Sequence, residues 1–412
     1  MNPLAIVFLA ALLLEAAVSF GARTAEVRSL RHPLPDDFKD SLDSDAYRRT
    51  QEYARDGARV GLAASSLDLV VVLVFWLSGG FGWWDRVVRA TGWGGVAVGL
   101  LYVGGLVLAR SVLSLPFGLY STFVVEKKYG FNRMSSATYL GDLAKGLSLA
   151  LLLGGPLLAA VLWLLAHGGS WPFLVLWAGG VLLTVLMQYV LPIWIMPLFN
   201  RFTPLAEGEV RDAVVAYTER VGFPIRSLQV VDGSRRSTKA NAFFTGFGRN
   251  KRLALYDTLL ARHASDEIVA VVAHEVGHYR LRHVLRGMAA GFAQMALGIV
   301  ALSLLLGRPE LFAAFRVSEP SVYAGLVLAA LFMGPFAQVV SVPMLALSRH
   351  DEYQADAYAA RTGGGPAPMV RALKRLAADG LSHLTPAPLY VWLNYSHPPM
   401  AERVRALDIT EP

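Results

Sequence analysis

Cysteine is absent from this 412-residue chain, which excludes disulfide bonds and thiolate metal sites, so any metal site must use His, Glu or Asp. Charged residues are also scarce at 17%, whereas apolar residues make up 54% of the chain. Together with a mean hydropathy of +0.44, these proportions exceed what a soluble core of this size can bury. The composition therefore predicts a polytopic membrane protein that is mainly α-helical.

The chain also lacks any basic module interleaved with aromatic residues, although its formal net charge is +7. Its Lys and Arg residues lie beside apolar stretches, which is typical of proteins that meet an anionic membrane surface. We therefore expect a lipid bilayer as partner and no nucleic acid. The sequence carries no signal for an oligomeric state.

Long apolar runs are abundant. The run 4–21 has no basic residue before it, so we interpret it as a retained span and not as a cleaved signal peptide. Stretches of about 20 apolar residues predict seven membrane spans in total, at about 4–21, 60–82, 93–117, 145–166, 172–196, 285–306 and 322–347.

Basic residues are distributed unevenly between the loops that join these spans. Alternation from an outside N-terminus puts 22–59, 126–144, 200–284 and 348–412 on one face, and these segments hold nearly all Lys and Arg. By the positive-inside rule that face is cytoplasmic, and it belongs to the inner membrane if the source is bacterial. The opposite loops contain only Arg86, Arg89, Arg308 and Arg316.

Several polar side chains fall within the spans or at their ends. A charged group facing lipid costs at least about 2.5 kcal/mol near the bilayer centre, so we expect these residues to face one another or a hydrated cavity. They are Glu15, Asp68, Arg110, Lys145, Gln188, Gln294 and Gln338.

We divide the chain into five N-terminal spans (1–199), a catalytic segment (200–284), two further spans (285–347) and a C-terminal catalytic segment (348–412). An amphipathic helix is expected near 208–221. Residues 228–231 and 253–256 are typical of short strands, and 241–247 lies between them. This small sheet is expected to stand next to the helix that follows it, where an edge strand would hold an extended substrate by main-chain hydrogen bonds.

The most informative motif is His274-Glu275-Val276-Gly277-His278. On a helix, predicted here from about 266 to 284 with Ser265 at its cap, positions i and i+4 share a face. The two imidazoles can therefore bind one Zn²⁺, while Glu275 acts as the base toward the attacking water. A third ligand six residues after His278 is excluded, because that position is Val284. His283 lies off the ligand face of a continuous helix, and we interpret it as structural.

A second charged helical stretch follows the last span and returns to the same face of the membrane. Within it Glu352 and Asp356 are one turn apart. We predict that Glu352 is the third zinc ligand, with Asp351 as the alternative, and that Asp356 accepts a hydrogen bond from a ligating imidazole.

Near the C-terminus, His397 precedes two prolines that force an extended backbone and then begin a helix. A His held in this way can donate a hydrogen bond to a developing oxyanion, although a packing or capping role is an alternative. Arg403, in the helix that follows, either orients this site or pairs with an acid.

Together, these motifs resemble those of the type I CaaX prenyl endopeptidases, integral-membrane zinc metalloproteases that remove the terminal tripeptide from prenylated proteins. The resemblance covers almost the entire chain. It rests on the motif His274 to His278, on the stretch Glu352 to Asp356, and on the segments 47–53, 126–132, 197–200, 241–242, 255–260 and 396–399.

The resemblance implies seven helices around a large water-filled chamber, with a zincin-type catalytic domain and one zinc ion at the cytoplasmic end. It also implies His274, His278 and Glu352 as ligands and Glu275 as the base. Auxiliary roles follow for His397 in catalysis and for Asn241, Ala242 and Arg403 in substrate binding. The substrate is expected to be a peptide or protein, either prenylated or, in a bacterium without prenylation, unfolded.

Two other functions fit parts of the sequence. A non-catalytic zinc-containing membrane chaperone or translocon quality-control factor would explain the spans and the metal. However, structural zinc sites usually close with four protein ligands, whereas this motif set offers three and a base. A transporter would explain the spans but not the catalytic residues.

Overall fold

The computed structural model describes residues 2–169, 171–223, 225–245 and 251–408. Seven stretches of helix in this part of the chain are long and apolar enough to cross a membrane, which confirms the predicted number. They are Pro3–Ser29 (α1), Ser44–Leu77 (α2), Gly95–Glu126 (α4, η2), Ser136–His167 (α5, η3, α6), Pro172–Phe199 (α7, η4, α8), His283–Leu305 (α12) and Val322–Thr362 (α14). Within the composite stretches, the elements are α4 Gly95–Tyr120, η2 Ser121–Glu126, α5 Ser136–Leu149, η3 Ala150–Gly154, α6 Gly155–His167, α7 Pro172–Val190, η4 Leu191–Ile195 and α8 Met196–Phe199.

The second span ends earlier than predicted. The expected boundary at residue 82 is wrong, because α2 stops at Leu77 and a separate short helix, α3 (Gly80–Arg89), follows. Gly79 between them adopts φ +80°, a left-handed conformation that glycine takes without steric cost and that ends a helix.

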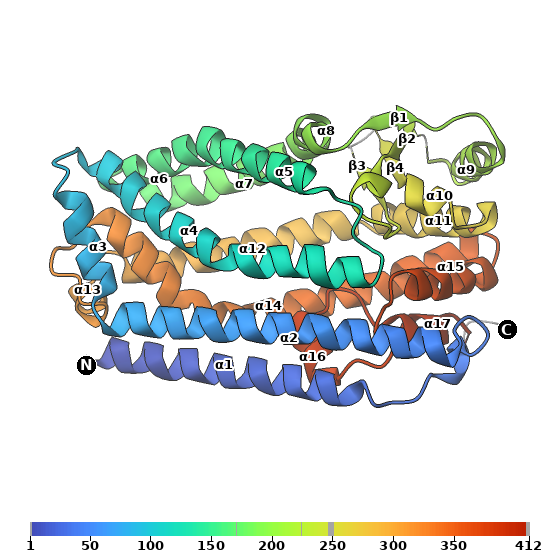
Figure 1. Cartoon of the computed structure of the whole chain (residues 1–412). Coiled ribbons are helices and arrows are strands. Elements are labelled where there is room, and N and C mark those ends of the chain that lie inside the picture. The colour runs from blue at the N-terminus through green and yellow to red at the C-terminus, as the bar shows by residue number, and fades with distance from the viewer. Residues whose placement is uncertain (1, 170, 224, 246–250, 409–412) are drawn as a thin grey trace.

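The last membrane helix is longer than predicted. At 41 residues, α14 extends over about 60 Å at 1.5 Å per residue, roughly twice the thickness of a hydrocarbon core. It therefore crosses the bilayer and continues beyond it as one helix, which runs almost the full length of the molecule in Figure 1. This continuation carries Glu352 and Asp356.

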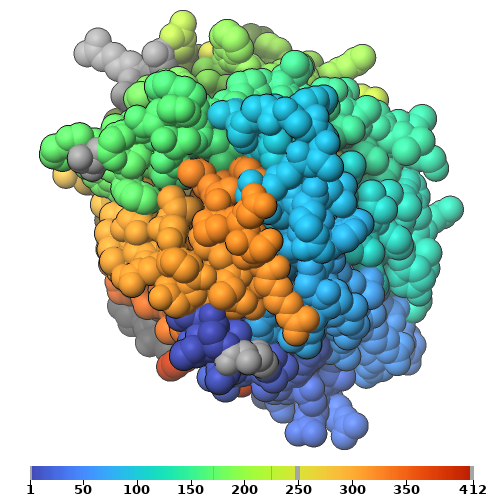
Figure 2. Space-filling model, turned by 90° about the vertical axis from the view of Figure 1, so that its left-hand side faces the viewer, coloured from blue at the N-terminus to red at the C-terminus, as the bar shows by residue number. Residues whose placement is uncertain are grey.

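The end of the molecule that contains the N-terminus is closed by two short helices, α3 and α13 (Pro309–Ala314), which Figure 2 views from outside. The Trp76 Nε1–H donates to the carbonyl oxygen of Ala314 at 2.8 Å. A Cβ added to Gly82 would overlap the carbonyl oxygen of Arg316. The loops predicted to share the face with few basic residues therefore pack together.

The opposite end holds a mixed sheet and the remaining helices (Figure 1). In the described part of the chain the strand order is β1-β2-β4-β3, with β2 and β4 parallel and the outer pairs antiparallel. The two predicted strands are confirmed as β2 and β4. The segment 241–247 between them contains β3, although residues 246 and 247 lie outside the described residues. The strands are Phe202–Pro204 (β1), Ser227–Val231 (β2), Ala242–Thr245 (β3) and Arg252–Tyr256 (β4).

A hydrophobic core at this end joins the sheet to the helices around it, and its buried residues include Val214, Leu255, Val272 and Leu373. Within the sheet, Ala254 of β4 pairs with Phe243 of β3. The helices are Asp36–Phe38 (η1), Glu209–Arg220 (α9), Gly233–Arg235 (η5), Asp257–Leu260 (α10), Ser265–Arg280 (α11), Pro366–Asp379 (α15), Pro388–Asn394 (α16) and Met400–Asp408 (α17).

The ends of α11 differ from the expectation. Ser265 is the first helical residue and not the cap; Ala264 stands at the cap, and its N–H donates to Glu267 Oε2 at 3.3 Å. The helix ends at Arg280 and not near 284. Arg282 then adopts φ +59°, which breaks the chain direction before α12.

Several of the polar residues predicted within the spans have recorded contacts with other polar groups. Arg110 contacts Asp68 at 3.0 Å, and the Gln338 amide donates to the Leu393 carbonyl at 3.1 Å. Lys145 donates to the Leu198 carbonyl at 2.8 Å. These contacts reduce the cost of placing the polar groups in the membrane region.

Glu26 near the end of α1 joins this helix to the C-terminal segment. Its carboxylate accepts hydrogen bonds from His383 Nδ1 and from the Ala387 N–H, both at 2.8 Å. Glu26 and His383 are both buried. These two hydrogen bonds therefore fix the position of the segment that leads into α16 and on to His397.

We expect Glu26→Ala to lower the free energy of unfolding by about 1–3 kcal/mol for each donor left unpaired. Thermal unfolding of the detergent-solubilised chain measures this loss. Glu15→Ala is the matched control, since Glu15 lies on the same helix and accepts only a local bond from Ser19 among its recorded contacts. Equal stability of the two variants would contradict the expectation.

Candidate metal centre

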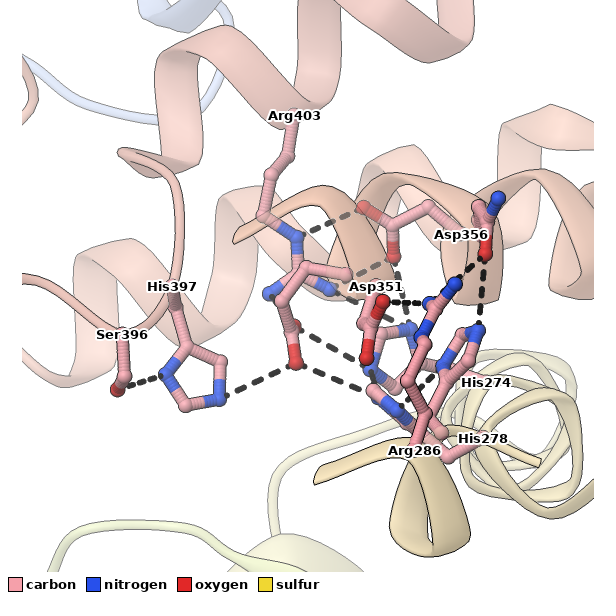
Figure 3. A network of polar contacts seen from close by, with 11 residues as sticks. His274, His278, Arg286, Asp351, Asp356, Ser396, His397 and Arg403 are labelled. Carbon is pink, nitrogen blue, oxygen red and sulfur yellow. Dashed lines mark hydrogen bonds and ion pairs between the residues drawn. The ribbon is translucent and has the colours of Figure 1, made fainter. Parts of the chain in front are cut away.

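Three potential metal ligands converge between α11 and α14. The Nε2 atoms of His274 and His278 lie 3.1 Å apart. Glu352 Oε1 is 3.3 Å from His278 Nε2, and Glu352 Oε2 is 3.5 Å from His274 Nε2. One donor atom from each residue fits within 4.8 Å of the others. The structure therefore brings together the three residues that the sequence predicted as ligands; Figure 3 labels the two histidines among them.

Gly277 allows the two helices to come this close. A Cβ added at this position would lie 3.2 Å from the Ala355 Cα and 3.2 Å from the Tyr358 Cβ. A larger residue would push α11 away from α14. The glycine within the motif thus helps to set the distance between the histidines and Glu352.

The chemistry of this cluster fits a zinc ion. Two imidazole nitrogens and a carboxylate are a donor set that zinc prefers, and three protein ligands leave a position open for catalysis. Glu352 Oε2 is buried and, among the described residues, has no hydrogen-bond partner, although the Arg403 Nη1 lies 3.2 Å away. A buried acceptor facing two imidazoles is stabilised by a cation between them.

Asp356 orients one of the imidazoles. Its Oδ1 is 2.8 Å from His274 Nδ1, so His274 donates from Nδ1 and leaves its Nε2 free for a metal. This is the contact predicted from the sequence. Burial lowers the pKa of His274, but the contacts with Asp356 and Glu352 outweigh burial and raise that pKa to about 9.

Arg403 on α17 locks Asp356 in place. The Arg403 Nε donates to Asp356 Oδ2 at 2.7 Å, and its Nη2 donates to Oδ1 at 2.6 Å. Arg403 is only 5% exposed. Of the two roles considered for Arg403, these contacts show pairing with an acid. Its role in substrate binding stays a prediction.

The alternative ligand Asp351 points elsewhere. Its carboxylate is paired with Arg286 of α12, and it does not belong to the cluster of three donors. The geometry therefore favours Glu352 over Asp351.

His397 approaches the cluster from the segment between α16 and α17 (Figure 3). Its Nε2 is 3.3 Å from Glu352 Oε1, and its Nδ1 is 2.9 Å from Ser396 Oγ. Its side chain is 61% exposed. Partial desolvation by the surrounding protein lowers the pKa of His397, opposed by the charge of Glu352. A neutral His397 next to the ligands can donate from Nε2 when Ser396 donates to Nδ1.

Glu275 faces a cavity of about 1130 Å³ beside the ligands. The cavity is bounded by α7, η4, β3, α11, α12 and α14, and its walls include Gln188, Asn241 and His278. Burial raises the pKa of Glu275, opposed by charge on His274 and His278. A carboxylate at a cavity wall next to two candidate metal ligands is placed to exchange protons with a bound substrate.

Asn241 and Ala242 lie at the start of β3, an edge strand in the described part of the sheet. The Asn241 Oδ1 accepts a bond from the Ala242 N–H at 2.9 Å, and Ala242 is in register with Leu255 of β4. Asn241, Phe243 and Thr245 line the same cavity as Glu275. An edge strand therefore lies beside the candidate site, as expected, and the roles of Asn241 and Ala242 stay predictions.

Two family models together cover nearly the whole chain. Residues 24–201 match "CAAX prenyl protease N-terminal, five membrane helices", and residues 204–411 match "Peptidase family M48". The chain belongs to peptidase family M48.

Curated relatives of this M48 protein agree with the family models. "CAAX prenyl protease 1 homolog" of Oryza sativa is 38% identical over 75% of the chain and 73% of its own length. "CAAX prenyl protease 1" of Saccharomyces cerevisiae is 32% identical over 91% of the chain and 88% of its own length. A solved structure, "Crystal Structure of S. mikatae Ste24p", has a TM-score of 0.91 at 30% identity and covers 99% of both chains.

The M48 protein is therefore a membrane-embedded metalloendopeptidase with a fold like that of Ste24p. This confirms the expected family, fold class and reaction class. A non-catalytic chaperone and a transporter are not favoured.

Sequence reasoning missed one part of the site. His283, which a continuous helix would turn away from the ligands, lies against His278 with 3.0 Å between their Nδ1 atoms. The break at Arg282 redirects the chain, and its own residue type gives no signal of such a break.

Proposed function

We propose that this M48 protein is a zinc-dependent endopeptidase in which His274, His278 and Glu352 hold one Zn²⁺ and Glu275 is the base. The observation that carries the proposal is the convergence of the three ligands next to Glu275 at the wall of a large cavity. Family membership supports a metal, generally zinc.

The reaction is the hydrolysis of a peptide bond. Zinc supplies a Lewis acid that activates water at neutral pH. Glu275 takes a proton from the attacking water as the new C–O bond forms, and it passes this proton to the amide nitrogen as the C–N bond breaks. His397 donates from Nε2 to the carbonyl oxygen as negative charge develops there.

We propose that the substrate is a prenylated peptide in an extended conformation. The edge of β3 offers main-chain groups for pairing with such a peptide, which agrees with the roles predicted for Asn241 and Ala242. Apolar side chains that also line the cavity offer a surface for a lipid chain, among them Met187, Leu191, Leu285 and Leu347. The relatives carry the name CAAX prenyl protease.

We also propose that the metal centre faces the cytoplasm. The sheet and the motif helices lie at the end of the molecule that carries most Lys and Arg, opposite α3 and α13 (Figure 1). Positive residues are retained on the cytoplasmic side of membranes.

A farnesylated CAAX peptide and the same peptide without the prenyl group test this function. We expect the purified protein in detergent to cleave the farnesylated peptide faster. Treatment with a zinc chelator should abolish cleavage, and added Zn²⁺ should restore it. Circular dichroism before and after chelation is the control for folding.

Cleavage that survives complete zinc removal would overturn the zinc mechanism. Equal cleavage of both peptides would overturn the role of the prenyl group. A protein that binds zinc but cleaves neither peptide, nor unfolded casein, would instead support the chaperone alternative.

A further inference from the structure

A chain of polar contacts extends from His278 away from the metal centre. His278 Nδ1 is 3.0 Å from His283 Nδ1, and His283 Nε2 is 3.0 Å from Gln354 Oε1. The Gln354 Nε2 is in turn 3.1 Å from His350 Nε2. His283 is 4% exposed, so its ring is held away from bulk water.

We infer that His283 is a positioning residue that fixes the tautomer and orientation of the ligand His278, through a hydrogen-bonded relay that ends on Gln354 and His350. This inference rests on the proposed zinc site and adds to it. It gives His278 the kind of support that Asp356 gives His274.

The direction of each hydrogen bond in the relay follows from the bond between His278 and His283. A neutral His278 that presents its Nε2 lone pair to a metal carries its proton on Nδ1. It therefore donates to His283 Nδ1, which must accept. The neutral ring of His283 then carries its proton on Nε2 and donates to Gln354 Oε1.

An independent contact fixes the orientation of the Gln354 amide. The Arg286 Nη2 also lies 3.3 Å from Gln354 Oε1. Arginine only donates hydrogen bonds, so the atom that faces both Arg286 and His283 must be the amide oxygen. The amide nitrogen is left to donate to His350. All steps of the relay thus agree on one arrangement of protons.

The break between α11 and α12 makes the relay possible. Along a continuous helix, His283 would point about 140° away from His278. Arg282 instead adopts φ +59°, a left-handed conformation that is sterically unfavourable for a non-glycine residue. Beyond this step, the ring of His283 lies within hydrogen-bond distance of both His278 and Gln354.

The test is zinc affinity of the full chain in detergent, measured from metal content after equilibration with graded chelator. Removing a group that supports a metal ligand typically weakens metal binding about 10–100-fold, and we expect that loss for His283→Leu. His283→Asn keeps an acceptor toward His278 and should restore most of the affinity. His167→Leu is the matched control, since His167 is exposed at the end of α6.

Spectra of the Co²⁺-loaded proteins separate positioning from general stability. We expect altered d–d bands for His283→Leu, with the parent spectrum in His283→Asn. If His283→Leu is too unstable to purify, Gln354→Leu removes the next link and should weaken zinc binding in the same direction. Parent-like affinity and spectrum in His283→Leu, or in Gln354→Leu when that variant replaces it, would overturn the inference. A parent chain that binds no zinc would instead refute the proposed function.

Discussion

Glu275→Gln should lower the turnover of a cleaved peptide by about 10²–10⁴ while the zinc content stays that of the parent protein. The amide cannot take the proton of the attacking water, but it fills the same space. Glu275 is not part of the donor cluster of His274, His278 and Glu352. The loss should therefore appear in kcat, measured with saturating peptide, and not in the metal content.

Glu219→Gln provides the control for this experiment, because Glu219 is an exposed acid on α9, outside the candidate site. It should cleave at the parent rate. If Glu275→Gln also cleaves at the parent rate with normal zinc content, another group must be the base. If it loses zinc, Glu275 has a role in holding the metal that the geometry does not indicate.

The local part of the site could be predicted from the sequence because its spacing is set by helix geometry. His274 and His278 share a face at any i, i+4 positions of a helix, and Glu352 and Asp356 do the same. Counting membrane spans then placed both helices on one side. The structure brings the same residues together, so periodicity and hydropathy were sufficient for this much.

Features that depend on contacts between elements could not be predicted in this way. Hydropathy predicts the end of the seventh span near residue 347. It reports contact with lipid and not the end of a helix, and α14 continues to Thr362. The left-handed step at Arg282 has no Gly or Pro to indicate it, so the position of His283 was missed. β1 has three residues, too few for an alternating pattern.

Arg403→Leu should cause a large loss of stability. Arg403 pairs with Asp356 through two bonds and with Glu352 at 3.2 Å, and these carboxylates are only 2% and 4% exposed. Removing the guanidinium leaves the carboxylates of Asp356 and Glu352 buried without their positive partner. Such a loss typically costs about 3–5 kcal/mol of unfolding free energy. Unfolding should be measured in excess chelator, because bound zinc would partly replace the lost positive charge.

Arg405→Leu is the matched control on the same helix, since Arg405 pairs with Asp37 at the surface with its side chain 54% exposed. Such a pair contributes about 0–1 kcal/mol. The double variant Arg403→Leu with Asp356→Asn should recover part of the lost stability, because the buried charge of Asp356 is also removed. It should not recover zinc affinity, since a neutral amide orients His274 less strongly than a carboxylate. Equal losses for Arg403→Leu and Arg405→Leu would show that the buried pair does not stabilise the site.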